Sequence, residues 1–424
     1  MKRFGSRAVF ATLAVAVVAS LAAGVAGAST RGAKADVKLT FWQTMNDQET
    51  PTLAGLVKKY EAANPGVTVE LVTVPFDQRD QKFTAAAQAG QAPDVMRAEI
   101  ADVASWASQG FLADITSMVS AADKADYLPA AFAYDQFNGK TWGLPQVTDA
   151  PALMYNKRLL KAAGITAAPA TMADLQAACD KLGAGKGIFL RGDSYWTLGW
   201  IWAYGGDLLN YPGKRILVSN AGSVAGLDAY AKLTNGRCAM PNKDYSNDYG
   251  NAMTAFKAGQ VAMIVNGPWS TADVLSGAEF KDPANFGIAP LPKGPGGKQG
   301  APVGGHSYVI SRNSKNTAAA YKFIQWLAAA PQQAVFAAKN NLLPTRVSAY
   351  AVPTVKQNKI ISAFLGVMKV ATTRPVTPAG GQIFVDFTPA VQKLLSGKAT
   401  ASAAANEVAN AWAKKLFKGF KIVK

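Results

Sequence analysis

Residues 37–89 read VKLTFWQTMNDQETPTLAGLVKKYEAANPGVTVELVTVPFDQRDQKFTAAAQA. Residues 37–42 and 67–74 are short runs rich in Val, Leu and Thr, and the first also contains Phe41 and Trp42, which is typical of strands. Residues 52–63 and 79–89 repeat apolar side chains at helical spacing. The turns at 64–66 and 90–93 contain Gly and Pro, which end each helix. This order of strand and helix predicts the parallel sheet of an α/β protein.

The same pattern continues outward from this stretch. Further strands are predicted at 153–155, 261–265 and 308–310, and further helices at 172–182, 318–329 and 401–417. A stretch rich in Gly and Pro, residues 291–305, is the best candidate for a flexible crossing of the chain. Because domains usually contain about 100–200 residues, a chain of 424 residues should form two or three domains or two lobes.

Composition removes several kinds of functional site. The chain has one histidine and two cysteines, so it can build neither a multi-histidine zinc site nor a four-thiolate metal site. Any triad of nucleophile, histidine and carboxylate would have to use His306. With 49% hydrophobic and 17% charged residues, the chain is globular and not disordered. We expect no metal and no cofactor.

The N-terminus is typical of a secretory signal peptide. Lys2, Arg3 and Arg7 precede the uncharged, mostly apolar run 8–28, and small residues allow cleavage after Ala28 or Ala35. The alternative is an uncleaved membrane anchor. No cysteine follows the apolar run, so we expect no lipid-modified N-terminus. The remaining chain should be exported to the periplasm or the extracytoplasmic cell surface.

The net charge is +17, and removal of residues 1–35 leaves 39 basic and 27 acidic residues, a net charge of +12. The cations are scattered along the chain, so we interpret them as a solvated surface and expect no nucleic-acid partner. Attraction to an anionic envelope or an anionic ligand is the alternative. Cys179 and Cys238 would meet an oxidising compartment, where they could pair or remain buried free thiols.

Several aromatic residues lie beside predicted turns. Trp42 ends the first strand, Tyr195 and Trp196 are followed by Trp200 and Trp202, and Trp269 follows Asn266-Gly267-Pro268. Such rings stack on the apolar faces of sugars, while polar side chains bind the hydroxyls. A place in the core is the alternative, and it is favoured for at least one of Trp200 and Trp202.

Eight short motifs occur in an order and spacing that resemble the family 1 extracellular solute-binding proteins of ABC importers, above all the maltose, maltooligosaccharide and trehalose binders. The motifs are KLTFW (38–42), APDV (92–95), GLP (143–145), YNK (155–157), AFKAG (255–259), AM (262–263), GPW (267–269) and APLP (289–292). The resemblance covers nearly all of the chain that follows the signal peptide.

The resemblance implies a two-lobed periplasmic-binding-protein fold of type II, in which each lobe is a mostly parallel sheet flanked by helices and the ligand binds between the lobes. We place the N-terminal lobe at 36–147 and 308–355, and the C-terminal lobe at 148–307 and 356–424. The chain would cross near 145–149, 304–308 and 351–355. The family is not enzymatic, its closed form docks on membrane permease subunits, and we expect a monomer.

Carried over motif by motif, the resemblance implies a set of sugar-contacting residues. Asp149 and Trp269 follow the family's spacing most closely, whereas Asp47 and Asp193 could be merely solvated and His306 could be a satisfied structural histidine. Ala98 and Ala101 depart from the family pattern, which leaves the sugar open. The full set is Gln43, Asn46, Asp47, Arg97, Glu99, Asp149, Asp193, Tyr195, Trp196, Trp269, Gly305, His306 and Arg374.

The sequence therefore predicts a protein that captures an α-glucoside or maltooligosaccharide by lobe closure. Two other functions stay open. One is binding of an anionic oligosaccharide or a sugar phosphate, suggested by the net charge and by Arg97 and Arg374. The other is a secreted glycoside hydrolase, which would need two carboxylates flanking the scissile bond, such as Asp149 and Asp193.

Overall fold

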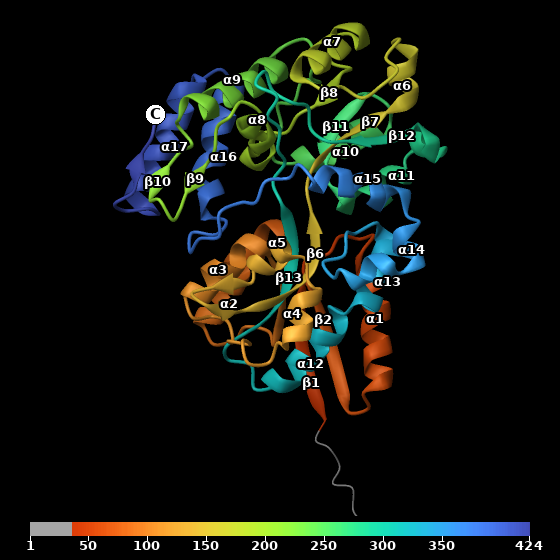
Figure 1. The fold of residues 1–424 in the computed structure, drawn as a ribbon, viewed down its shortest axis with the longest axis vertical. Coiled ribbons are helices and arrows are strands. Elements are labelled where there is room, and N and C mark those ends of the chain that lie inside the picture. The colour runs from red at the N-terminus through yellow and green to blue at the C-terminus, as the bar shows by residue number, and fades with distance from the viewer. Residues whose placement is uncertain (1–35) are drawn as a thin grey trace, which may run out of the picture. The chain divides into compact units, whose positions relative to one another are not determined.

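A computed structural model describes residues 36–424, so the predicted signal segment lies outside the described part (Figure 1). The first sheet has five strands in the order β2-β1-β3-β13-β6. Strands β1 and β2 pair in parallel with Val37 opposite Val67, because the helix between them returns the chain to the same edge. The strands are β1 (Val37–Gln43), β2 (Val67–Thr73), β3 (Val95–Glu99), β6 (Gly143–Asp149) and β13 (Gly304–Ile310).

Helices and a small hairpin accompany the first sheet. Leu39 and Phe41 of β1 are fully buried, and the Phe41 ring lies 5.7 Å edge-on from Phe323 of α12. The elements are α1 (Thr50–Ala63), α2 (Arg79–Gln88), α3 (Ile100–Ser108), α4 (Ala121–Asp126), α5 (Pro129–Ala133), β4 (Gln136–Phe137), β5 (Lys140–Thr141), α12 (Thr317–Leu327), α13 (Ala330–Asn340) and α14 (Pro353–Lys356).

The second sheet has four strands in the order β12-β7-β11-β8 and has a hydrophobic core of its own. Its strands are β7 (Ala152–Asn156), β8 (Ile188–Phe189), β11 (Met263–Asn266) and β12 (Phe286–Ala289). The helices of this part are α6 (Lys157–Ala162), α7 (Met172–Leu182), α8 (Leu198–Ala203), α9 (Ala221–Asn235), α10 (Asp248–Lys257), α11 (Thr271–Leu275), α15 (Lys359–Met368), α16 (Gln382–Leu395) and α17 (Ala401–Lys415). Trp200 and Trp202 are both buried in this core, which confirms the core interpretation.

The chain ends beside a third, small sheet of order β14-β10-β9, formed by β9 (Leu209–Asn210), β10 (Arg215–Ile216) and β14 (Lys421–Ile422). The α/β fold is confirmed, but the sheets are mixed and not mostly parallel. Among the strands of residues 36–424, only β2-β1-β3, β11-β8 and β10-β14 pair in parallel, whereas β13 runs antiparallel to both β3 and β6. Within the same residues, no helix is both long enough and apolar enough to cross a bilayer.

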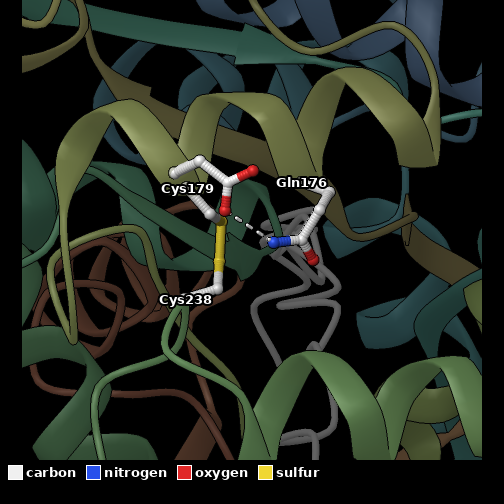
Figure 2. The surroundings of a disulfide bond; sticks show 4 residues. Gln176, Cys179 and Cys238 are labelled. Atoms are coloured by element: carbon white, nitrogen blue, oxygen red, sulfur yellow. Dashed lines mark hydrogen bonds between the residues drawn. A yellow bond between two sulfur atoms is a disulfide. The ribbon is translucent and has the colours of Figure 1, made fainter.

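Cys179 on α7 and Cys238 after α9 form a disulfide bond (Figure 2). The two residues are 59 positions apart, and both are buried. One turn earlier on α7, the Gln176 amide donates a hydrogen bond to Asp180 Oδ1 at 3.0 Å. Of the two alternatives that the sequence leaves open, the structure shows the disulfide.

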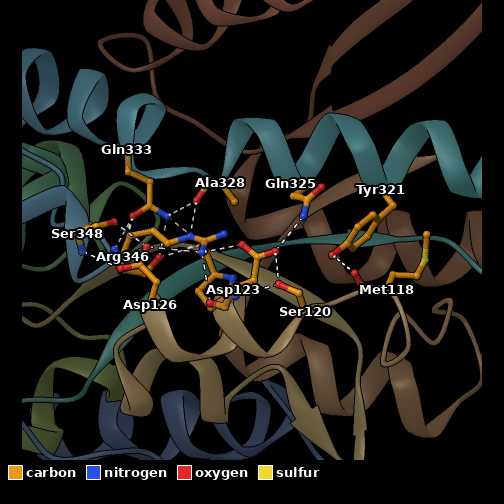
Figure 3. Close-up of polar contacts among 12 residues, drawn as sticks. Met118, Ser120, Asp123, Asp126, Tyr321, Gln325, Ala328, Gln333, Arg346 and Ser348 are labelled. Carbon is orange, nitrogen blue, oxygen red and sulfur yellow. Dashed lines mark hydrogen bonds and ion pairs between the residues drawn. The ribbon is translucent and has the colours of Figure 1, made fainter.

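Arg346 holds the segment after α13 in place (Figure 3). Its Nη1 lies 2.9 Å from Asp123 Oδ1 and 3.7 Å from Asp126 Oδ2, and its Nε donates to the Ala328 carbonyl at 3.1 Å. The Gln333 carboxamide oxygen accepts the backbone N–H of Arg346 at 3.0 Å. Because a buried guanidinium needs such partners, this network is structural.

Asp135, which follows α5, is a fully buried carboxyl group. Its Oδ2 accepts a hydrogen bond from Ser307 Oγ at 2.9 Å, whereas no residue in the described part of the chain pairs with Oδ1. Burial raises the pKa of Asp135 to about 8. This group therefore keeps its proton at neutral pH in the folded protein.

The free energy of unfolding should decrease as the pH rises, because the pKa of Asp135 is higher in the folded protein than in the unfolded chain. The unfolded pKa is about 3.9, so between pH ~4 and ~8 the folded state binds a proton that the unfolded state releases. The free energy of unfolding should then fall by more than about 1 kcal/mol from pH 5 to pH 8. Urea unfolding of native protein and of Asp135→Asn measures this. An equal fall in the variant would contradict the assignment.

Candidate functional site

The candidate site lies where the first sheet's strands end. Strands β1, β3 and β6 run in the same direction, because β13 is antiparallel to both of its neighbours. Their carboxyl ends therefore share one edge of the sheet with the start of β13. That edge carries Gln43, Glu99, Asp149 and Gly305 from the predicted set.

Gln43 and Arg97 form hydrogen bonds with other protein groups at this edge of the sheet. The Gln43 amide donates to Thr73 Oγ1 at 2.7 Å, and its carbonyl oxygen accepts the Met45 N–H at 2.6 Å. Arg97 donates from Nε to Gln146 Oε1 and from Nη1 to Thr44 Oγ1, both at 2.9 Å. Both side chains are buried, and burial lowers the pKa of Arg97. Their hydrogen bonds hold the neighbouring segments together at the edge of the sheet.

Asn46 connects the turn before α1 with the segment after β11. Its Oδ1 accepts the backbone N–H groups of Gln48 and Glu49 at 3.0 Å, which fixes the side chain at the helix start. Its Nδ2 donates to the Trp269 carbonyl at 3.2 Å. The neighbouring Asp47 is exposed.

Trp269 belongs to an aromatic group. The 3-10 turn η3 (Pro268–Ser270) folds its ring back over Gly267, where a Cβ atom would lie 1.9 Å from the ring. The half-buried ring packs against the core of the first sheet although η3 follows β11 of the second. Its centroid lies 6.5 Å from that of Trp196, whose ring carries the Arg191 guanidinium at 3.1 Å.

Glu99 and Arg374 form a buried ion pair between distant parts of the chain. Glu99 ends β3, and its Oε2 caps α3 by accepting the Ala101 N–H at 2.9 Å. Arg374, between α15 and α16, donates from Nη2 to Glu99 Oε1 and from Nε to the Val303 carbonyl at 3.0 Å. The Tyr134 hydroxyl accepts the Arg374 N–H at 2.7 Å.

Asp149 ends β6 as a buried carboxyl group that no side chain or backbone group within residues 36–424 hydrogen-bonds. Burial raises its pKa to about 7, against the lowering effect of Arg374. Gly304 leaves room for it, because a Cβ there would lie 2.2 Å from Asp149 Oδ1 and 3.3 Å from Tyr195 Oη. A buried acceptor without a partner suits a ligand hydroxyl.

Tyr195 and Asp193 lie on the 3-10 turn η2 (Ser194–Thr197) and its start. Asp193 is exposed and accepts the Tyr195 N–H at 2.8 Å, so it caps the turn. The Tyr195 ring lies 5.1 Å from Trp196 and 5.6 Å from the Arg374 guanidinium carbon. Burial raises the pKa of Tyr195 well above its usual value, so its hydroxyl is a neutral donor and acceptor.

Gly305 and His306 occupy the start of β13. Gly305 has φ 143°, and a Cβ atom there would lie 2.2 Å from the Val147 carbonyl, so only glycine fits. Both ring nitrogens of His306 are buried, and within the described residues neither has a partner. Burial and three nearby arginines hold the pKa of His306 well below its usual value. The imidazole is neutral and is not a satisfied structural histidine.

Three further charged residues belong to this region, although sequence analysis did not select them. Arg79 of α2 pairs with the buried Asp102 of α3 at 2.7 Å. Glu49 is buried, its Oε1 has no partner within the described part, and burial raises its pKa. Their neighbours come from distant segments, so local sequence carries no signal of their roles. Together with Arg97, Glu99, Asp149 and Arg374, the region holds three arginines and four acids.

A separate groove of about 630 Å³ opens between helices α2 and α3 on one side and residues 378–382 and 415–416 on the other. Asp80 and Gln382 meet across it at 3.2 Å. None of the predicted contact residues lines this groove. The candidate site therefore rests on the contacts at the sheet edge.

Comparison with known proteins agrees with this geometry. Residues 46–334 match the family model of the bacterial extracellular solute-binding protein. A maltooligosaccharide ABC transporter solute-binding lipoprotein of Streptococcus pneumoniae (strain ATCC BAA-255 / R6) is 31% identical over 369 residues, which are 83% of this chain and 83% of the relative.

Two solved structures are similar along nearly their whole length. The GacH receptor of Streptomyces glaucescens GLA.O, solved unliganded and in complex with acarbose, superposes with a TM-score of 0.87 at 38% identity over 92% of this chain and 100% of that one. The Thermus thermophilus maltotriose-binding protein, bound with maltotriose, gives 0.76 at 26% identity over 88% and 99%. The chain therefore belongs to the bacterial extracellular solute-binding proteins, as the family match, the relatives and the two-lobed type II fold all show.

Proposed function

We propose that this protein binds a maltooligosaccharide or a related α-glucoside outside the cytoplasm and delivers it, as a monomer, to the permease subunits of an ABC transporter. The observation that carries the proposal is the aromatic group of Trp269 and Trp196 beside Asn46, with the unpartnered carboxyl of Asp149 on the same sheet edge. Rings stack on sugar faces, while amide and carboxyl groups bind hydroxyls. The names of the relatives support a glucoside.

The charge of the site favours a neutral ligand over an anionic one. Three arginines face four acids, and Arg79 and Arg374 are already held by Asp102 and Glu99. A phosphate or carboxylate ligand that paired with Arg79 or Arg374 would have to displace these ion pairs, and Arg97 already donates to Gln146 and Thr44. The net charge of +17 is therefore not a property of the candidate site.

A glycosidase is the weaker alternative. It needs one carboxyl group on each side of the scissile bond. Of the two candidates, Asp193 is exposed and already accepts the Tyr195 N–H as the cap of η2. Of these two carboxyl groups, only that of Asp149 accepts no hydrogen bond from a residue of 36–424. We propose that it acts as a hydrogen-bond acceptor and not as a catalytic acid.

We further propose that the lobes comprise 36–147 with 308–355 and 148–307 with 356–424, and that ligand favours their closed state. Asn46 and Glu99 would contribute from one lobe, and Trp269 and Tyr195 from the other. The contacts of Asn46 with Trp269 and of Glu99 with Arg374 support this, because each joins the first sheet to segments around the second. A ligand that touches both lobes stabilises the state in which both sets meet.

Titration with maltotriose tests the function. Native protein should bind it with a change in tryptophan fluorescence, and Trp269→Ala should lose about 1–3 kcal/mol of binding free energy, as a buried aromatic anchor does. Isothermal titration calorimetry measures both proteins.

The matched control is Trp142→Ala, which removes a half-buried tryptophan between β5 and β6 and should leave the affinity within twofold. Unchanged affinity in a folded Trp269→Ala protein would show that Trp269 packs in the core and does not contact the sugar. Shortening of maltotriose during the titration would favour the glycosidase.

A further inference from the structure

Two segments of the chain carry cations and no acid. Residues 208–220 contain Lys214 and Arg215, and residues 408–424 contain five lysines. Those lysines are Lys414, Lys415, Lys418, Lys421 and Lys424. Judged along the sequence alone, these residues are part of a scattered distribution.

The fold brings the two segments together. Strand β10 pairs in parallel with β14, so that Arg215 lies opposite Lys421. The Lys421 N–H donates to the Lys214 carbonyl at 2.9 Å, and the Val423 N–H donates to the Ile216 carbonyl at 2.9 Å. Helix α17, which ends at Lys415, packs against both strands. In Figure 1, β10, β9 and α17 lie together beside the C-terminus.

These cations are exposed and largely uncompensated. Lys415 pairs with Asp386 at 2.6 Å, whereas the other six form no ion pair within residues 36–424. Like charges directly opposite one another on neighbouring strands destabilise a sheet. Arg215 and Lys421 are such a pair, so the arrangement costs stability unless an anion outside the chain offsets it.

We propose that this basic surface, formed by Lys214, Arg215, Lys414, Lys418, Lys421 and Lys424, binds the headgroups of an anionic phospholipid membrane. Clustered lysines and arginines attract such headgroups electrostatically. Two aromatic rings accompany the cations, because half-buried Tyr211 and Phe420 lie 5.6 Å apart beside β10 and β14. Tyrosine rings such as that of Tyr211 are enriched at headgroup level, which favours a membrane over a soluble anion. Resting on the proposed function, this contact would keep the binding protein close to its permease.

Vesicle co-sedimentation tests the proposal. Native protein should sediment with vesicles of phosphatidylcholine and about one third phosphatidylglycerol, but not with phosphatidylcholine alone. Because each cation near the surface contributes about fivefold, replacing Arg215, Lys418, Lys421 and Lys424 by Gln should weaken this binding at least ~10-fold. Salt well above about 0.1 M should release the native protein.

A control variant removes the same charge elsewhere. Replacing Lys58, Lys59, Lys315 and Lys339 by Gln changes four exposed lysines of the first-sheet part that form no ion pair within the described residues. This variant should sediment within twofold of native protein. Equal losses in the two variants, binding to neutral vesicles, or no binding of native protein to anionic vesicles would each overturn the proposal.

Two readouts separate this proposal from the sugar-binding function. Maltotriose titration of both variants should give native affinity, because none of the changed residues belongs to the candidate site. Native protein that sediments with anionic vesicles but does not bind maltotriose would reject the function and leave the membrane surface intact. Retention by a purified anionic cell-wall polymer, with no retention by vesicles, would assign the surface to a polymer and overturn the lipid proposal.

Discussion

Replacing Arg374 by Met should lower the free energy of unfolding by about 3–5 kcal/mol, the range for removing one partner of a buried ion pair. The loss arises because Glu99 Oε1 would stay buried without its guanidinium partner. The next cation, Arg79 Nη2, lies 3.9 Å from the other carboxylate oxygen, which already caps α3. Urea unfolding followed by tryptophan fluorescence measures the loss.

Two further variants separate charge from packing. Glu99→Gln combined with Arg374→Met should recover part of the loss, since the double variant no longer buries an unpaired charge and the new carboxamide oxygen could still cap α3. Lys38→Met, which breaks the exposed pair of Lys38 with Glu70 at 2.9 Å, should cost less than about 1 kcal/mol. A loss below about 1 kcal/mol for Arg374→Met would show that this ion pair does not hold the two segments together.

Removing the disulfide should have the next largest effect. A bridge that closes a loop of 59 residues constrains the unfolded chain, and typical losses on its removal are about 2–4 kcal/mol. Replacing both Cys179 and Cys238 by Ala keeps the buried site apolar, so the loss reports mainly on the cross-link. Urea midpoints of native and variant protein give its size.

Reducing agent supplies the control for this prediction. It should lower the urea midpoint of native protein toward that of the double variant, and it should not change the midpoint of the variant. Identical midpoints of native protein with and without reductant would contradict a structural role for the bond between Cys179 and Cys238.

The local part of the fold could be predicted from the sequence. The predicted helix 172–182 coincides with α7, and the strand predicted at 37–42 is one residue shorter than β1. Both depend on periodicity and on turn residues next to them, which a short window contains. The antiparallel insertion of β13 between β3 and β6 depends on pairing between distant segments, and the local pattern does not encode it.

In the candidate site, too, some residues could be predicted from the sequence, whereas the partners of others depend on distant segments. Family spacing led to Glu99, Asp149 and Arg374, and the structure places all three at or beside one sheet edge. Gln43 could not be assigned its role from sequence, because its partner Thr73 lies on another strand. Arg79 and Glu49 were missed for the same reason: each acquires its neighbours only when α1 or α2 packs on the sheet.

Gly305 has a consequence for how this protein can evolve. Its positive φ and its approach to the Val147 carbonyl leave no room for a Cβ atom. Every missense substitution at this codon adds a Cβ atom. Such a substitution is therefore tolerated only if the neighbouring strand β6 also shifts. Substitutions in this segment should then fall on neighbouring positions such as His306, while Gly305 should stay the same across descendants.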